Sequence, residues 1–134
     1  MNCIFCEIAK GNATAEKIYE DENVLSFLDI RPLNIGHALV IPKKHYEDIL
    51  AVPENELSQL SIIAQKIAAK IVTALNPDGF NLIVNTGQAA GQSVFHFHYH
   101  IIPRYSDDKI KFNMLFKDYG NGEMKQIAEK IKNA

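Results

Sequence analysis

The sequence predicts an α+β fold: a mostly antiparallel sheet of about five strands, one long helix, and short helices near the N- and C-termini. Two observations support this prediction. Several strand-like stretches follow one another, and a single long helical pattern interrupts them. The two most apolar strand-like stretches are joined by a loop of the length found in hairpins. A doubly wound parallel sheet would instead need strands and helices in regular alternation.

Length and composition indicate one globular domain over residues 1–134, because 47% of the residues are hydrophobic and 22% are charged. The formal net charge is -2 and no basic run is longer than Lys43–Lys44, so a nucleic-acid polymer is not an expected partner. No apolar run has the length of a membrane span, and residues 1–10 lack the pattern of a secretory signal. We therefore expect no membrane partner and a cytoplasmic location.

The N-terminal elements follow from local patterns. Residues 3–10 are expected to form a short helix that ends at Gly11. Strands are expected at residues 17–20, 24–29 and 37–42, with turn-prone residues between them.

The clearest helical pattern covers residues 54–75, where apolar residues recur three and four positions apart. Further apolar residues widen the stripe to more than half of the helix surface. We therefore expect one face to pack on the sheet and another on a second subunit, which predicts a homodimer. The pattern leaves open which residues meet which surface. Strands at 80–85 and 94–102 and a helix at 123–133 complete the domain.

The strand expected at residues 94–102 contains the most informative motif, HFHYHII at residues 96–102. Side chains alternate between the two faces of a strand, so three imidazoles share one face. Each buried imidazole needs partners for a donor and an acceptor, which makes histidine a poor choice for structure alone. Two chemistries explain the cluster. The histidines either ligate a catalytic zinc, or they attack an electrophile and move protons without metal.

This motif fits the pattern His-apolar-His-apolar-His-apolar-apolar of the histidine triad (HIT) superfamily of nucleotide hydrolases and transferases. Other segments also resemble the Hint-type and related bacterial members at matching spacing, namely CIFCEI, YEDENVLSFLDI, GHALVIPKKH and NLIVNTGQAAGQSVFHFHYHIIPR. The resemblance covers about residues 3–105 and implies a HIT-type fold, whereas residues 106–134 carry no signature.

The resemblance implies catalytic roles for two histidines of the triad. His98 matches the nucleophile that attacks the α-phosphorus of a nucleotide and forms a nucleotidyl-imidazole intermediate. His100 matches a partner that donates to a non-bridging phosphate oxygen or to the leaving group. His37 matches a further histidine that the family places near the triad. For His100 and His37, the residues alone also allow packing or surface histidines at strand ends.

The loop between the last two expected strands resembles a phosphate-binding loop. The resemblance places Asn85, Gly91, Gln92 and Ser93 around the phosphate, with the Ser93 hydroxyl near the leaving atom. Glycine lets the backbone approach an anion closely, and successive N–H groups can form an anion nest. A Gly-rich hairpin turn without a ligand is the alternative.

Asp29 follows an apolar strand, and the resemblance implies that its carboxylate accepts hydrogen bonds from both ribose hydroxyls. A turn-capping aspartate at a strand end is the alternative. The next residue, Ile30, belongs to a group of apolar residues that either line a base pocket or form core. The other members of this group are Phe5, Ile8, Phe27 and Leu28.

The two cysteines, Cys3 and Cys6, are too close together for a disulfide scaffold, and no βαβ unit accompanies them as in a redox motif. Two thiolates supply half of a tetrahedral zinc site. Some bacterial HIT proteins that resemble this chain carry structural zinc on two cysteines and two histidines, which implies His45 and His96 as the other ligands. Two half-buried thiols without metal are the alternative. If His96 ligates zinc, the other two histidines form the metal-free catalytic pair.

Taken together, these motifs predict an enzyme that hydrolyses or transfers a purine, AMP-like nucleotide at its α-phosphate, with no organic cofactor. A nucleoside phosphoramidase is the first expectation and a dinucleoside polyphosphate hydrolase the second. A nucleotide-binding or scaffolding protein with little turnover is the alternative from another class. A hydrolase that uses all three triad histidines as zinc ligands is disfavoured, because Asn, Gln and Ser adjoin the triad and no H-E-x-x-H helix is present.

Overall fold

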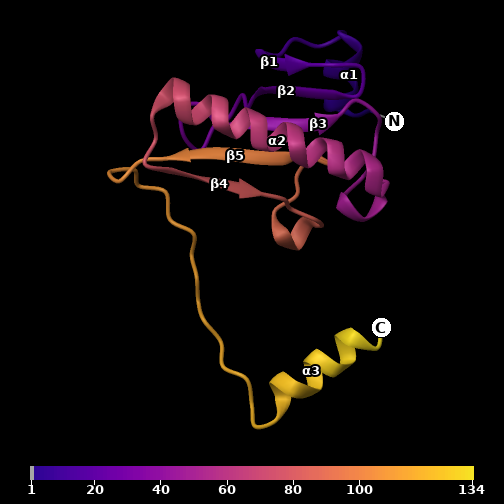
Figure 1. The fold of residues 1–134 in the computed structure, drawn as a ribbon, viewed down its shortest axis with the longest axis vertical. Helices are drawn as coiled ribbons and strands as arrows, with labels where there is room; N and C mark the ends of the chain where they lie inside the picture. The colour runs from indigo at the N-terminus through magenta and orange to yellow at the C-terminus, as the bar shows by residue number, and fades with distance from the viewer. Residues whose placement is uncertain (1) are drawn as a thin grey trace.

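The computed structural model describes residues 2–134 and contains a five-stranded antiparallel sheet in the order β1-β2-β3-β5-β4 (Figure 1). The predicted α+β class and the number of strands are confirmed. The strands are β1 (Lys17–Glu20), β2 (Val24–Leu28), β3 (Ala38–Pro42), β4 (Gly79–Ile83) and β5 (Tyr99–Arg104). The helices are α1 (Ile4–Lys10), α2 (Glu54–Leu75) and α3 (Glu123–Lys132). Two short 3-10 turns lie at Ile49–Ala51 and Gln88–Ala90.

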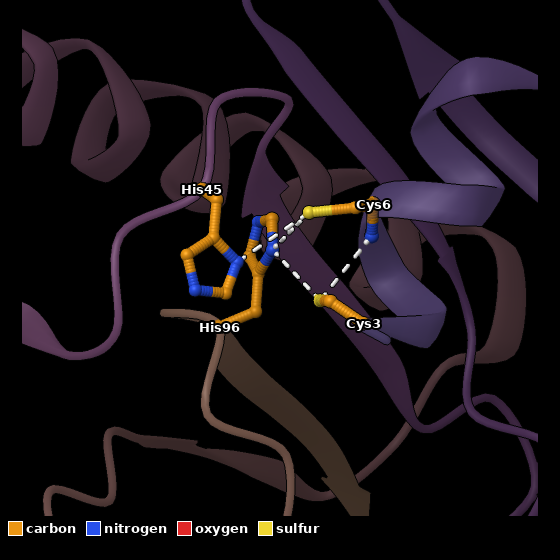
Figure 2. A group of neighbouring side chains, drawn as sticks. All are labelled: Cys3, Cys6, His45 and His96. Carbon is orange, nitrogen blue, oxygen red and sulfur yellow. Dashed lines mark hydrogen bonds between the residues drawn. The ribbon is translucent and has the colours of Figure 1, made fainter. Parts of the chain in front are cut away.

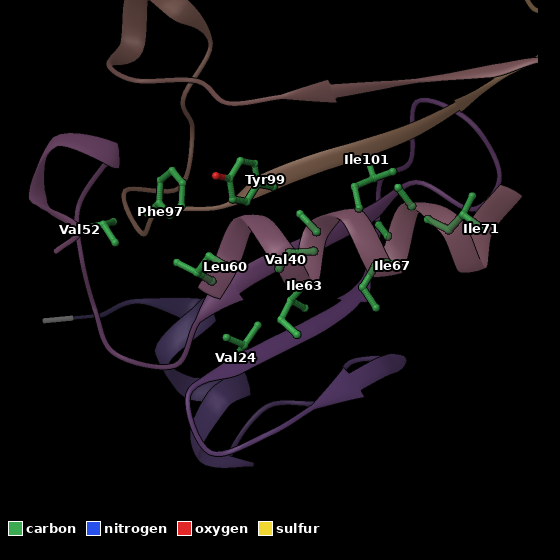
Figure 3. Close-up of a cluster of buried hydrophobic side chains, with 13 residues drawn as sticks. Val24, Val40, Val52, Leu60, Ile63, Ile67, Ile71, Phe97, Tyr99 and Ile101 are labelled. Atoms are coloured by element: carbon green, nitrogen blue, oxygen red, sulfur yellow. The ribbon is translucent and has the colours of Figure 1, made fainter. Parts of the chain in front are cut away.

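Helix α2 coincides with the predicted range and lies along one face of the sheet (Figure 1). One side of the helix is buried against strand residues such as Val40 and Ile101 (Figure 3). The buried helix residues are Leu60, Ile63, Ala64, Ile67, Ala68 and Ile71. A second apolar stripe of the helix stays exposed in the single chain, with Ile62 at 52% and Val72 at 42%. The sheet therefore covers only part of the wide apolar surface that the sequence predicts.

The opposite face of the sheet packs on α1. Successive side chains of β2 and β3 point to opposite faces of the sheet, and both faces of these central strands are buried. Leu25 and Leu39 pack with Phe5 and Ile8 of α1, whereas their neighbours in the strands pack toward α2. Gly11 ends α1 with φ 82, in the left-handed region that glycine adopts without strain, as predicted.

The strand predicted at residues 94–102 is wrong in its start, because β5 begins only at Tyr99. Hydrogen-bonding groups in the preceding segment have partners outside the sheet. The Phe97 N–H donates to the Tyr46 carbonyl at 2.6 Å, and the His96 carbonyl accepts a hydrogen bond from the His98 ring at 2.7 Å. Two of the three triad histidines therefore precede the strand.

The alternation predicted for the triad nevertheless holds. Phe97, Tyr99 and Ile101 pack in the core beneath α2. His96 and His98 face the other way, and both rings contact the Phe5 ring of α1 edge-on. The β4–β5 hairpin is antiparallel, also as predicted.

Residues 111–134, which we call the C-terminal arm, leave the sheet and end in α3 at a distance from the rest of the chain (Figure 1). Every residue of the arm is exposed. The helix predicted at 123–133 is present as α3, but it covers no surface of its own domain. Among residues 2–134, no helix is both long and apolar enough to cross a bilayer.

Candidate functional site

The triad rings line the side of the sheet that faces α1, close to the start of β5. The His98 and His100 rings lie 4.7 Å apart between centroids, and the Phe5 ring lies 5.1 Å from His98. His96 is fully buried and His98 is nearly so, whereas His100 is only partly buried. The structure therefore brings His98 and His100 together, with His100 nearer the surface.

A backbone carbonyl determines where His98 carries its proton. The His98 Nδ1 atom lies 2.7 Å from the His96 carbonyl oxygen. Because a carbonyl oxygen only accepts, Nδ1 must carry the hydrogen and donate it. Burial lowers the pKa of His98, so the ring is neutral near pH 7. The lone pair of the neutral ring is then on Nε2, as a nucleophile requires.

A second chain of hydrogen bonds determines the tautomer of His100. The Leu33 N–H donates to His37 Nδ1 at 3.1 Å, so neutral His37 carries its hydrogen on Nε2. His37 Nε2 donates to His100 Nδ1 at 2.9 Å, which leaves the hydrogen of neutral His100 on its own Nε2. Burial, reinforced by the neighbouring His98 and His37, lowers the pKa of His100 to about 4. His100 is therefore a neutral hydrogen-bond donor beside His98.

Asp29 lies at the edge of this cluster. Its Oδ2 is 3.6 Å from His37 Nε2, and its Oδ1 accepts the Arg31 N–H at 2.9 Å. The turn-capping bond expected as the ordinary role of Asp29 is thus present, and the partly exposed carboxylate also adjoins the histidines. Ile30 is 94% exposed beside it, whereas Phe5, Ile8 and Phe27 belong to the core.

In the loop between β4 and β5, Asn85 and Gly91 lie side by side. Gly91 has φ 99, and a Cβ at this position would lie 3.7 Å from Asn85 Nδ2. Any other residue at position 91 would strain the backbone. Ser93 is exposed two residues further along the loop.

The structure gives Gln92 a different environment from the one expected. Its side chain is buried, and its Oε1 accepts the Gly87 N–H at 2.9 Å. Its Nε2 donates to the carbonyls of Glu47 at 2.7 Å and Val94 at 3.2 Å. The amide is therefore fully engaged in holding the loop in place, which leaves no side-chain donor of Gln92 for a phosphate.

Cys3, Cys6, His45 and His96 converge on one point, although they come from three separate segments (Figure 2). Cys3 Sγ and Cys6 Sγ lie 3.4 Å and 3.5 Å from His96 Nδ1, and Cys6 Sγ lies 3.4 Å from His45 Nδ1. Sulfur and nitrogen ligands of a tetrahedral zinc ion lie about 3.6 Å apart. The four side chains thus fit a zinc ion with little movement.

The tautomer of His96 suits a metal ligand. Its Nε2 donates to the Pro42 carbonyl at 2.7 Å, so the lone pair of Nδ1 faces the two sulfurs. Burial is the main cause that lowers the pKa of His96 to about 4, which keeps the ring in the neutral form that ligates. Among the described residues, no group of potential ligand atoms contains all three triad histidines. This arrangement argues against the hydrolase with three zinc-bound triad histidines.

Backbone groups are the partners that the sequence did not reveal. The Leu33 N–H and the carbonyls of Pro42 and His96 select the tautomer of one histidine each. Every residue type except proline has both groups, so no side-chain pattern identifies them.

Comparison with known protein families and relatives gives consistent results. A family model described as the HIT domain matches residues 10–107. An uncharacterised HIT-like protein of Methanocaldococcus jannaschii is 44% identical over 132 residues, which cover 97% of this chain and 98% of that protein. An adenylylsulfatase of Arabidopsis thaliana is 44% identical over 107 residues, which cover 80% of this chain and 54% of that protein.

Solved structures agree with this result. A crystal structure from Streptococcus mutans superposes with a TM-score of 0.93 at 39% identity, covering 99% of this chain and 85% of that one. A zinc-bound histidine triad family protein from Mycobacterium smegmatis gives a TM-score of 0.78 at 39% identity, covering 100% of this chain and 99% of that one. The HIT model covers most of the chain, and relatives match it nearly end to end, so the chain belongs to the HIT family.

Proposed function

We propose that this protein hydrolyses or transfers purine nucleotides at the α-phosphate through His98, with nucleoside phosphoramidates as its preferred substrates. The observation that supports this most directly is the His98 Nδ1 donor bond to the His96 carbonyl, which leaves Nε2 unprotonated. The relative named an adenylylsulfatase supports a substrate with an adenylyl group. A protein that only bound nucleotides would have no use for a free imidazole nitrogen in this position.

In the proposed reaction, His98 Nε2 forms a bond to the α-phosphorus and the bond from phosphorus to the leaving amine breaks. The amine departs with the bonding electron pair and takes up a proton. His100 Nε2–H donates either to this leaving group or to a non-bridging oxygen. Water then attacks the nucleotidyl-imidazole, releases the nucleoside monophosphate, and gives its proton back to the site. His98 Nε2 recovers its lone pair.

The remaining residues bind and orient the nucleotide in this proposal. Asp29 accepts hydrogen bonds from the ribose hydroxyls through its exposed carboxylate edge, with Ile30 beside the base. Asn85, Gly91 and Ser93 surround the phosphate, because the backbone at Gly91 is open enough for an anion to approach. Gln92 holds this loop to the backbone of Glu47.

We also infer a structural zinc ion on Cys3, Cys6, His45 and His96. The ligand distances support it, as does the zinc-bound relative from Mycobacterium smegmatis. Zinc would supply a fixed crosslink between α1, the segment after β3 and the segment before β5. It would not take part in bond cleavage, because neither His98 nor His100 belongs to the ligand set. Free cysteines as ligands suit the reducing cytoplasm.

We further infer a homodimer. Apolar residues of α2 and of the edge strand β4 form an exposed surface, which we call the apolar patch. Its members are Val72, Leu75, Phe80 and Leu82. Strand register places Leu82 opposite Ile101, which packs beneath α2, so the β4 members lie on the same side of the sheet as the helix. A patch of this kind supports contact with a second subunit.

A turnover assay with two substrates tests the proposed chemistry. An adenosine 5′-phosphoramidate and a diadenosine polyphosphate are each incubated with protein treated with a chelator, and with the variant His98→Ala. We expect faster release of AMP from the phosphoramidate, and no turnover by the variant. Preference for the diadenosine compound would instead assign the protein as a dinucleoside polyphosphate hydrolase. Turnover of neither substrate would leave the nucleotide-binding alternative.

A further inference from the structure

Gln92 closes part of the loop between β4 and β5 into a ring. The Gln92 N–H donates to the Gly87 carbonyl at 3.1 Å, and the Gly87 N–H donates to Gln92 Oε1 at 2.9 Å. This reciprocal pair joins the two ends of residues 87–92, which we call the closed loop. The short 3-10 turn at Gln88–Ala90 and the left-handed Gly91 lie within it. Gln92 thus determines the shape of the closed loop.

The same side chain attaches the closed loop to the segment that follows β3. Gln92 Nε2 donates its two hydrogens to the carbonyls of Glu47 at 2.7 Å and Val94 at 3.2 Å. The Gln92 side chain is only 3% exposed. A buried amide keeps one orientation when all of its groups are paired, because any other orientation would leave polar groups without partners. Gln92 therefore also fixes the position of the closed loop relative to Glu47.

The histidine triad is attached to the neighbouring residue of that segment. The N–H of Phe97, which lies between His96 and His98, donates to the Tyr46 carbonyl at 2.6 Å. Two consecutive carbonyls, those of Tyr46 and Glu47, thus hold both the triad and the closed loop. The distance from His98 Nε2 to an anion bound at the closed loop depends on this shared attachment.

Residues 45–47, which we call the anchor segment, are themselves held in place by other elements. The His45 ring contacts the His96 ring edge-on, with 5.0 Å between centroids. Tyr46 packs against the core beneath α2, and its hydroxyl donates to the Glu56 carboxylate of that helix. The anchor segment is therefore a fixed reference for the groups that bind to its carbonyls.

We propose that Gln92 is a positioning residue for the transfer to His98, because its side chain holds the closed loop at the distance that brings the α-phosphorus to His98 Nε2. This inference rests on the proposed function and adds to it a residue that acts through the loop rather than on the nucleotide. A misplacement of about 1 Å can lower a reaction rate about a hundredfold, whereas a bound product does not need the geometry of attack. Loss of the Gln92 amide should therefore lower kcat more than the affinity for AMP.

The variant Gln92→Met tests this inference, because methionine fills a similar volume without the amide groups. Gln88→Met is the matched control, because the Gln88 side chain is exposed in the same loop. With the adenosine 5′-phosphoramidate, we expect kcat of Gln92→Met to fall about tenfold to a hundredfold. The dissociation constant of AMP, measured by calorimetry, should rise by less than about threefold. Gln88→Met should change both values by less than about twofold.

Two results with Gln92→Met would overturn the inference. A rise of about tenfold or more in the dissociation constant of AMP would mean that Gln92 donates to the phosphate directly. An unchanged kcat with a lowered Tm would mean that Gln92 only stabilises the fold. Wild-type turnover is the reference for both results. If the wild-type protein releases no AMP from the phosphoramidate, the proposed function fails, and hydrogen exchange then decides whether Gln92 holds the loop.

Hydrogen exchange of the Gly87 amide tests the position of the loop in the wild-type protein. This N–H donates to Gln92 Oε1, so we expect it to exchange at least about tenfold more slowly than in Gln92→Met. Because the loop is held before the nucleotide binds, AMP should change the wild-type exchange rate by less than about twofold. Protection of Gly87 that develops only with AMP would mean that the nucleotide orders the loop, and would overturn the inference even if Gln92→Met failed to fold.

Discussion

The three histidines of the triad differ in which ring nitrogen carries the hydrogen, because each ring contacts a different partner. The Pro42 carbonyl directs the lone pair of His96 toward two sulfurs, and the His96 carbonyl leaves the Nε2 of His98 free. His37 makes His100 a donor. The sequence predicts that these residues gather on one side of the chain, but the tautomers depend on backbone partners far away in sequence. At the residue scale, the sequence thus predicts where the histidine side chains gather, but not which ring nitrogen carries the hydrogen.

His37 provides a test of this relay. In His37→Asn, the donor to His100 Nδ1 is lost, and His100 can carry its hydrogen on either nitrogen. We expect kcat with the phosphoramidate to fall about tenfold to a hundredfold, less than the about 10²–10⁴-fold loss from removing a general acid in His100→Ala. Steady-state kinetics of the two variants check this order. Equal losses of kcat would contradict it.

Burial of His100 also predicts a pH dependence of stability. Its pKa is about 4 in the folded chain and about 6.5 when unfolded, so the unfolded state binds more protons between these values. The contribution of neutral His100 to the free energy of unfolding is therefore complete above pH 6.5. It is lost as the pH falls toward 4, by at most about 3 kcal/mol. Urea unfolding of wild type and His100→Asn at pH 7 and pH 4.5 measures it. The variant should lose less stability on acidification than wild type, and an identical loss would refute the assignment.

At the scale of single elements, the sequence pattern predicts a helix or strand well when its backbone hydrogen-bond partners lie close in sequence. The 3.6-residue period defines α2 to the residue, because a helix satisfies its own backbone. The start of β5 is not predictable from the pattern, because the Phe97 N–H donates to the Tyr46 carbonyl, outside the sheet. The resemblance places Gln92 at the phosphate, whereas its contacts with Glu47 and Gly87 depend on the folded loop and leave no trace in the sequence pattern.

The proposed zinc ion would hold helix α1 in position, because Cys3 and Cys6 lie at the start of this helix. Removing a ligand with Cys6→Ser or His45→Ala should reduce bound zinc from one ion per chain and lower Tm by about 10 °C. Elemental analysis and thermal unfolding give the two values. The substitution Asn12→Ser, beyond the end of α1, is a control that should change neither. Wild-type protein without zinc, purified in the absence of chelators, would contradict the proposed site.

Two residues of α2 allow folding and assembly to be tested separately. Ile63 is 9% exposed and faces the sheet, whereas Val72 is 42% exposed in the apolar patch. Ile63→Glu should reduce the free energy of unfolding by more than about 3 kcal/mol, because it buries an unpaired charge. Val72→Glu should leave the fold intact and weaken the dimer. Thermal unfolding measures the effect on stability, and solution mass measures the effect on the dimer. A wild-type protein that is a stable monomer would contradict the expected effect on the dimer.

At the scale of the whole molecule, the proposed catalytic site and the proposed dimer contact lie on opposite faces of the sheet. The α1 face carries the histidine cluster and the four candidate zinc ligands, and the α2 face carries the apolar patch. The sequence predicts both faces through alternation along the strands, whereas the direction of the C-terminal arm depends on the Arg104–Asp108 pair. Catalysis and assembly should therefore be separable by substitution.

Acid-quench mass spectrometry can detect the covalent bond that the proposed reaction forms between His98 and the nucleotide. Wild-type protein is mixed with excess adenosine 5′-phosphoramidate and quenched within milliseconds, and its peptides are then mapped. We expect an added adenylyl group on His98, absent from unreacted protein and from His98→Ala. An adenylyl group on another residue, or turnover by wild type with no adduct at any quench time, would contradict it.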